Sequence, residues 1–100
     1  CCRQCNQAIT SESCAIAMAG IGKGESHEHT FRNPGGFSFH VLCFDRAPGC
    51  QAIGGYTLEA SWFSGYEWCL ALCSGCQTHL GWFFRKPDHD FVGLVATRLS

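Results

Sequence analysis

Two Cys-x-x-Cys pairs, Cys2/Cys5 and Cys73/Cys76, lie near opposite ends of the chain. Zinc takes tetrahedral thiolate ligands at about 2.3 Å, and a Cys-x-x-Cys turn lets two sulfurs reach one ion. Two such turns complete a four-cysteine site with no open position for water or substrate. The pattern therefore predicts one structural zinc ion, which clips the two ends of the chain together.

Other metal ligands, and a redox role for the Cys-x-x-Cys motifs, are alternatives to this four-cysteine site. Cys1 adjoins Cys2 and could replace it, although Cys-x-x-Cys is the commoner spacing. Two redox motifs are the alternative to zinc, but no thioredoxin-like βαβ pattern surrounds either of them. His27 and His29 could share a metal, but without a third ligand nearby a polar loop is preferred. His79 is interpreted as a packed histidine, with a spare metal ligand as the alternative.

The five cysteines outside the two Cys-x-x-Cys pairs, which we call knuckles, provide evidence on the cellular compartment. The chain has nine cysteines, an odd number, so full internal pairing is impossible. Free thiols fit a reducing, intracellular compartment such as the cytoplasm or nucleus. A secreted domain is the alternative, with Cys14 and Cys50 as the first disulfide candidates.

Length and charge exclude several classes of function. One hundred residues make one domain. The formal net charge is −1 and no basic run occurs, which argues against nucleic-acid binding, because phosphate contacts need clustered lysine and arginine. No apolar stretch is long enough to span a membrane. We expect a monomer without nucleic-acid or membrane partners.

Short segments with strand-like alternation, separated by glycine-rich turns, predict an antiparallel, all-β domain. The expected strands are residues 37–44, 56–63, 66–73, 79–85 and 91–99. Residues 45–55 are expected to form a loop, and 11–36 a polar, glycine-rich segment. In the strand at 79–85, strict alternation puts Leu80, Trp82 and Phe84 on one face.

The aromatic residues Trp62, Trp68, Trp82 and Phe84 fall on three of these segments. One interpretation is an ordinary core, because each large aromatic buries about 150–250 Å². The other is an aromatic cage that binds a cation, with Glu59 or Glu67 nearby, or a compact neutral ring. Spacing does not separate these interpretations.

Several ordered motifs resemble one known family. They are Cys-Arg-Gln-Cys at 2–5, Asn33-Pro34 before an aromatic strand, Ser61-Trp62-Phe63-x-Gly65-Tyr66-x-Trp68, Cys73-x-x-Cys76, His79-x-Gly81-Trp82-x-Phe84, and Phe91-x-Gly93-Leu94. The chain resembles the CULT domain, the thalidomide-binding domain of cereblon-type proteins, also found as stand-alone bacterial and secreted eukaryotic proteins. The match runs from Cys2 to Leu99, so residues 1–100 are interpreted as one CULT domain.

The resemblance implies a fold and a site. The fold would be a β-tent, two antiparallel sheets at roughly right angles pinned by the four-cysteine zinc. Trp62, Trp68 and Trp82 would be the walls of the cage, with Phe84 as its floor or rim. The strand through Ser61 would present the Ala60 carbonyl and the Trp62 N–H to a cyclic imide.

The resemblance also implies ligands and a flap. Asn33 and Pro34 would lie on a flap over the mouth of the cage. Family ligands include thalidomide-type glutarimides, succinimides, uracil-type nucleobases and peptides that end in a C-terminal cyclic imide. In cereblon the domain is a substrate receptor of the ubiquitin pathway. Here Ala60 replaces a histidine of cereblon and the flap lacks another, so we expect ring binding but question drug-induced partner recruitment.

Two other classes of function remain as alternatives to a non-catalytic binding module. Zinc-containing methionine sulfoxide reductases share the β-tent architecture, but they need a reactive cysteine on a late strand. The segment 91–99 has none, and no acid–base–nucleophile set is evident. The third alternative is a structural or protein-interaction domain whose tryptophans are all core.

Overall fold

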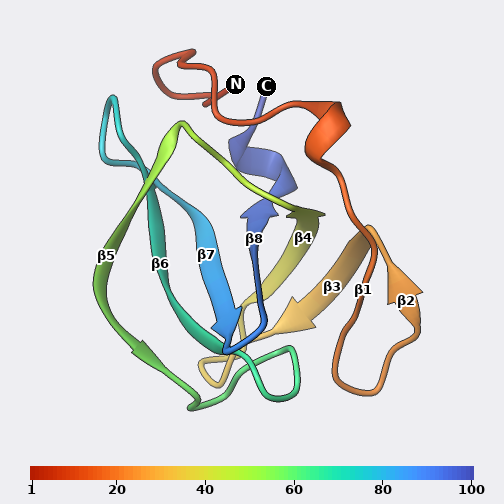
Figure 1. Ribbon diagram of the computed structural model, residues 1–100. Helices are drawn as coiled ribbons and strands as arrows, with labels where there is room; N and C mark the ends of the chain where they lie inside the picture. Colours follow the sequence, from red (N-terminus) through yellow and green to blue (C-terminus); the bar gives the residue numbers. More distant parts are fainter.

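The computed structural model describes all 100 residues and shows an all-β domain of two antiparallel sheets (Figure 1). Strands β1 and β2 form a small hairpin, and the other six form one sheet in the order β3-β4-β8-β7-β6-β5. The strands are β1 (Met18–Ala19), β2 (Glu25–Ser26), β3 (Glu28–Arg32), β4 (Ser38–Phe44), β5 (Cys50–Thr57), β6 (Glu67–Cys73), β7 (His79–Lys86) and β8 (His89–Val95). Two 3-10 turns, η1 (Glu12–Cys14) and η2 (Ala96–Arg98), complete the chain. None of its helical segments has the length and hydropathy that crossing a bilayer requires.

The structure confirms the predicted all-β class with two antiparallel sheets, but four predicted segments are wrong. Residues 11–36, expected as a polar, glycine-rich segment, contain β1, β2 and β3. Residues 45–55 are not all loop, because β5 occupies Cys50–Thr57, and the predicted strand at 56–63 ends at Thr57. The register of β5 on β6 shifts between Ile53 and Thr57, where Gly54 has φ +78°. Glycine weakens a local strand signal, so β6 rather than local sequence defines this strand. The last strand ends at Val95, where η2 begins.

A bulge divides strand β7 between the two faces of the sheet. Ala71 pairs with Gly81, whereas Leu72 pairs with His79, so Leu80 is an extra residue without a partner on β6. A bulge reverses the alternation of side chains beyond it. The prediction that Leu80 shares a face with Trp82 and Phe84 is therefore wrong: Leu80 packs in one core cluster and the two aromatics in another.

The two core clusters lie beside different functional features. The first, which we call the metal-side core, contains Cys2, Ile9, Phe44, Ala47, Ala71, Cys73, Leu80, Val92 and Leu94. The second, the aromatic core, contains Phe31, Val41, Cys43, Phe63, Tyr66, Trp82, Phe84, Phe91 and Val95. Because β7 contributes to both cores, it joins the two parts of the domain.

Two glycines let β7 and β8 approach closely. A Cβ atom on Gly81 would lie 2.0 Å from the Gly93 carbonyl oxygen. A Cβ atom on Gly93 would lie 2.8 Å from Val41 Cγ1 and 3.1 Å from Phe84 Cε2. Gly93 therefore leaves the space that Phe84 occupies at the floor of the cavity described below.

Candidate functional site

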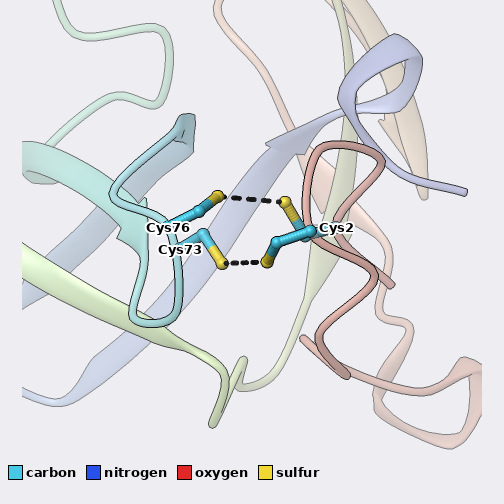
Figure 2. Close-up of side chains that lie close together, drawn as sticks. Cys2, Cys73 and Cys76 are labelled. Carbon is cyan, nitrogen blue, oxygen red and sulfur yellow. Dashed lines mark hydrogen bonds between the residues drawn. The ribbon is translucent and has the colours of Figure 1, made fainter.

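Four cysteine sulfurs, two from the N-terminal loop and two from the β6–β7 turn, meet at one point (Figure 2). Cys2 and Cys5 belong to the N-terminal loop, while Cys73 ends β6 and Cys76 lies in the turn to β7. The four sulfur atoms are within 4.8 Å of one another. The Cys2 and Cys76 sulfurs are 3.7 Å apart, and those of Cys5 and Cys73 are 3.5 Å apart.

These separations fit a zinc tetrahedron and not a pair of disulfides. Zn–S bonds of about 2.3 Å give sulfur–sulfur edges of about 3.8 Å, whereas a disulfide bond is about 2.05 Å long. All nine cysteines are free thiols, including Cys14 and Cys50. The donor set therefore forms a structural site for one zinc ion, which confirms the prediction from the cysteine spacing.

The two knuckles repeat one backbone arrangement. In each, the amide of the first cysteine donates to the carbonyl five residues later, and the amide four residues later donates back to the cysteine carbonyl. The bonds are Cys2–Gln7 and Asn6–Cys2 in the first knuckle and Cys73–Thr78 and Gln77–Cys73 in the second, all at 2.7–2.8 Å. Asn6 and Gln77 both have left-handed backbones, with φ of 65° and 66°. Equivalent geometry thus presents one thiolate pair from each end.

Thr78 supports the ligand Cys76. The Thr78 hydroxyl lies 3.0 Å from the Cys76 sulfur. Hydrogen bonds from the Thr78 side chain and then from its backbone lower the pKa of the Cys76 thiol to about 6. A lower pKa favours the thiolate, which is the form that binds metal.

An aromatic cavity of about 370 Å³ opens on the face of the sheet that carries Trp82 and Phe84. Its lining residues are Asn33, Pro34, Glu59, Ala60, Trp62, Trp68, Trp82 and Phe84. The rings of Trp62 and Trp82 meet at 78° with their centroids 4.8 Å apart, so they form a corner. Trp68 pairs across the sheet with Phe84 and adds a further wall.

The loop at 58–66, between β5 and β6, carries Trp62 into this corner. The Trp68 indole N–H donates to the Glu59 carbonyl at 2.7 Å. The Ile21 amide donates to the Trp62 carbonyl at 2.8 Å, and Phe31 stacks on the Trp62 ring at 4.9 Å and 8°. The loop is thus held from the wall of the cavity, from the β1–β2 hairpin and from β3.

Several backbone groups at the cavity have no hydrogen-bond partner within the chain. Among them are the Ala60 carbonyl oxygen, the Ala60 amide and the Trp62 amide N–H. Ala60 has φ +54°, a left-handed conformation that is unusual for alanine. A ligand in the cavity would find one acceptor and one donor two residues apart, with no charge on either.

Asn33, another residue that lines the cavity, is fixed by its own turn. Its side-chain oxygen accepts the Phe37 amide at 2.9 Å, and its carbonyl accepts the Gly36 amide at 2.9 Å. Pro34 follows it and also lines the cavity. The turn between β3 and β4 therefore contributes one side of the cavity.

Seven of the eight ligand-binding residues expected from the sequence line this cavity, and Ser61 does not. The Ser61 hydroxyl instead donates to the Phe63 carbonyl at 3.0 Å and accepts the Phe63 amide at 3.3 Å. Glu59 also lines the cavity. It was expected from the sequence only as a carboxylate near a cation cage and not as a residue that binds the ring. Glu67 instead pairs with Arg85 at 3.5 Å.

The histidines weighed as metal ligands have structural contacts. The His27 ring lies 3.2 Å from the Ile16 carbonyl, and the His29 ring lies 2.6 Å from the Met18 carbonyl. Both residues therefore tie the segment around β1 to the segment around β3. His79 is outside the sulfur cluster and packs on the Trp82 ring at 5.0 Å.

The chain is similar to cereblon proteins along nearly its whole length. It is 33% identical to cereblon of Danio rerio, 31% to that of Gallus gallus and 35% to that of Drosophila persimilis. These alignments cover 99%, 99% and 94% of the chain, but only 23%, 23% and 15% of the relatives. The chain thus spans less than a quarter of the length of these curated relatives. No protein-family model matches it.

Proposed function

Because the chain is a zinc-binding domain of the cereblon type, we propose that it is a non-catalytic module that binds uncharged cyclic imides in its aromatic cavity. The observation that carries this proposal is the pair of unpartnered backbone groups, on Ala60 and Trp62, beside a corner of indoles. The ligands would be glutarimide, succinimide and uracil-like rings, and peptides with a C-terminal cyclic imide.

The polar edge of an imide complements these two groups. An imide has one N–H donor flanked by two carbonyl acceptors. The N–H would donate to the Ala60 carbonyl, and one ring carbonyl would accept the Trp62 amide. No charged side chain is needed for this recognition.

The apolar part of the ring complements the indoles. Ring methylene groups would pack on the faces of Trp62, Trp68 and Trp82 and exclude water. A dry site penalises an unpaired polar group by about 1–3 kcal/mol, so an imide that satisfies its partners is favoured. An open-chain acid would bring a charge into this site and would be rejected.

The role of the longer protein follows from the same relationship. The relatives are cereblons of more than four times the aligned length. We propose that the domain is the substrate-recognition part of a cereblon-type protein, and that segments beyond these residues connect it to the ubiquitin pathway. Ala60 and the flap turn at Asn33 would alter how a drug-bound surface meets a second protein.

Calorimetric titration with glutarimide, N-methylglutarimide and glutaric acid tests the proposal. Glutarimide should bind. N-methylglutarimide should bind about 5- to 150-fold more weakly, because methylation leaves the Ala60 carbonyl unpaired at about 1–3 kcal/mol. Equal affinity for both rings would contradict recognition through the imide N–H, and binding of glutaric acid would contradict the preference for uncharged ligands.

A matched pair of variants locates the binding. Trp68→Ala removes a cavity wall, whereas Leu70→Ala removes an exposed side chain on the same face of β6. Trp68→Ala should weaken glutarimide binding at least 10-fold, and Leu70→Ala should leave it unchanged. An unchanged affinity in Trp68→Ala would remove the cavity from the proposal.

A cation is the second candidate ligand, because Glu59 places a carboxylate at an indole-lined cavity. Quaternary ammonium groups bind such aromatic cages through cation–π attraction. Tetramethylammonium in the same titration distinguishes the two ligand classes. Tetramethylammonium binding that is lost in Glu59→Gln would favour the cation. Glutarimide binding that survives in Glu59→Gln would favour the imide.

A further inference from the structure

We infer that Arg98 is a positioning residue for the aromatic cavity, because it contacts two of the side chains, His79 and Phe39, that pack on the Trp82 indole. This inference rests on the proposed function for its effect on affinity. Arg98 does not line the cavity, so it would act through Trp82 and not on the ligand.

The contacts form a short chain from Arg98 to Trp82. Arg98 Nη1 donates to the His79 carbonyl at 3.0 Å and lies 3.3 Å from His79 Nδ1. The Arg98 guanidinium also lies 5.7 Å from the centre of the Phe39 ring. The rings of His79 and Phe39 then meet the Trp82 indole at 5.0 Å and 5.3 Å, with angles of 88° and 77°. One side chain therefore supports two of the contacts of Trp82.

The bulge at Leu80 makes this arrangement possible. In a regular strand, His79 and Trp82 are three residues apart and point to opposite faces. Because Leu80 is the extra residue, His79 and Trp82 share one face and their rings come into contact. Bulges often aim a side chain toward a functional site.

The position of Arg98 is set by the N-terminal knuckle. The Arg98 carbonyl accepts the Arg3 amide at 3.1 Å, and Cys2 forms a bridge with Leu99. The guanidinium itself has no carboxylate within salt-bridge distance. Its contacts are thus neutral groups, so it is placed by geometry and not by an ion pair.

Arg98 also selects one form of the His79 ring. His79 Nε2 lies 2.8 Å from the Gly81 carbonyl, which requires a proton on Nε2. Nδ1 is then an acceptor that faces the Arg98 donor. The ring is held neutral and in one orientation between two hydrogen bonds, perpendicular to the Trp82 indole. Without Arg98, one of these bonds and the packing on Phe39 are lost.

The test compares Arg98→Met with the matched control Arg85→Met. Arg85 lies on the same strand as Trp82, but its guanidinium stacks on Tyr56 at 3.6 Å and pairs with Glu67. Both variants lose a packed guanidinium, and thermal melts should register both losses. Only Arg98→Met should change the ¹H–¹⁵N indole resonance of Trp82 in the ligand-free protein.

Affinity provides the second measurement. Glutarimide should bind Arg98→Met about 2- to 12-fold more weakly, because ordering a released side chain on binding weakens affinity by this amount. Arg98→Lys keeps one donor without the planar fork, so its affinity should lie between those of the wild type and Arg98→Met. Arg85→Met should bind like the wild type.

The outcomes separate the inference from the proposed function. An unchanged Trp82 resonance in Arg98→Met, or an equal change in Arg85→Met, overturns the inference whether or not glutarimide binds. A shifted Trp82 resonance with unchanged glutarimide affinity also overturns it. If the wild type fails to bind glutarimide while the Trp82 resonance shifts only in Arg98→Met, the proposed function fails and the positioning contact stands.

Discussion

The metal site and the aromatic cavity differ in the hydrogen bonding of their backbone polar groups. Around the zinc site, the backbone amides and carbonyls of Cys2 and Cys73 are paired within the chain, and the Thr78 hydroxyl lies at hydrogen-bond distance from the Cys76 sulfur. At the cavity, the Ala60 carbonyl and the Trp62 amide are left without partners. The paired groups of the knuckles contribute to stability, whereas the unpaired groups at the cavity remain available to a ligand.

The difference shows how one small domain supports an unfilled cavity. A domain of this length buries only about two-thirds of its unfolded surface. An unfilled cavity lowers its stability further. A structural zinc site contributes an apparent 10–16 kcal/mol, roughly, in finger peptides. The closed region therefore stabilises the fold in which the open region can remain incomplete.

Removing a zinc ligand should have the largest effect and should break both regions. Cys73→Ser leaves three thiolates, and Cys73 is also fully buried in the metal-side core. We expect loss of one bound zinc per chain and loss of cooperative unfolding, measured by metal analysis and thermal melting. Cys1→Ser is the matched control, because Cys1 is exposed and outside the sulfur cluster. If Cys73→Ser retained zinc and Cys1→Ser lost it, the assignment of Cys73 and not Cys1 as a zinc ligand would be wrong.

Two glycine substitutions, Gly81→Ala and Gly93→Ala, should destabilise the domain to different extents. Gly81→Ala forces a Cβ onto the Gly93 backbone carbonyl, which β8 fixes in place, and should destabilise the domain by about 3 kcal/mol or more. Gly93→Ala meets only the side chains of Val41 and Phe84 and should destabilise it by about 1–3 kcal/mol.

Chemical denaturation measures both values. Because the added Cβ would press on the Phe84 ring, which lines the cavity, glutarimide binding should also weaken in Gly93→Ala. A Gly93→Ala protein with unchanged affinity would show that the floor of the cavity does not contribute to binding.

Ala60→Gly should have a small effect that distinguishes backbone recognition from side-chain recognition. Glycine relieves the left-handed strain of Ala60, about 1–2 kcal/mol, but adds about 0.4–1 kcal/mol of unfolded-state entropy. The free energy of unfolding should therefore rise by about 0–1.6 kcal/mol, and glutarimide affinity should be retained. A large loss of affinity would mean that the Ala60 methyl group, not its carbonyl, contacts the ligand.

The smallest effect should be the pH dependence that His79 contributes. Burial lowers the pKa of His79, the Gly81 carbonyl raises it, and Arg98 lowers it again, with a net lowering. The unfolded chain, with an ordinary pKa of about 6.5, then binds more protons than the folded chain just below that pH. His79 therefore contributes stability that is present above about pH 6.5 and declines as the pH falls toward its folded pKa.

Thermal melts between about pH 7.5 and 5.5 check this sign. The melting temperature of His79→Gln should fall less steeply with decreasing pH than that of the wild type. Parallel curves would show that His79 has the same proton affinity in both states.

The parts of the fold that local sequence predicts well are those with strong spacing. The four zinc ligands were predicted from two Cys-x-x-Cys pairs, because the metal geometry needs only that spacing. Strands β4, β6 and β7 were predicted to within one residue at each end, since their alternation of apolar and polar residues is clear. The aromatic set was noted from composition and family resemblance, and its role as a binding site remains a prediction.

Other features depend on contacts that are distant in the sequence. Strand β5 contains Gly54 and Gly55 and pairs as an edge strand on β6, so its local signal is weak. Residues 58–63 of the loop were predicted as strand because they favour strands, but hydrogen bonds from Ile21 and Trp68 hold them as a loop. Arg98 gave no signal, because its partners His79 and Phe39 lie far away in the chain.

By itself, the sequence determined the all-β class and the zinc ligands, because metal coordination and strand alternation are properties of residue type and short spacing. Only the tertiary structure decided which side of the sheet each residue of β7 faces, because the bulge at Leu80 arises from its register on β6. That register separates Leu80 from Trp82 and brings His79 to the indole. The cavity and its support are therefore consequences of strand pairing, which no short segment of the chain specifies alone.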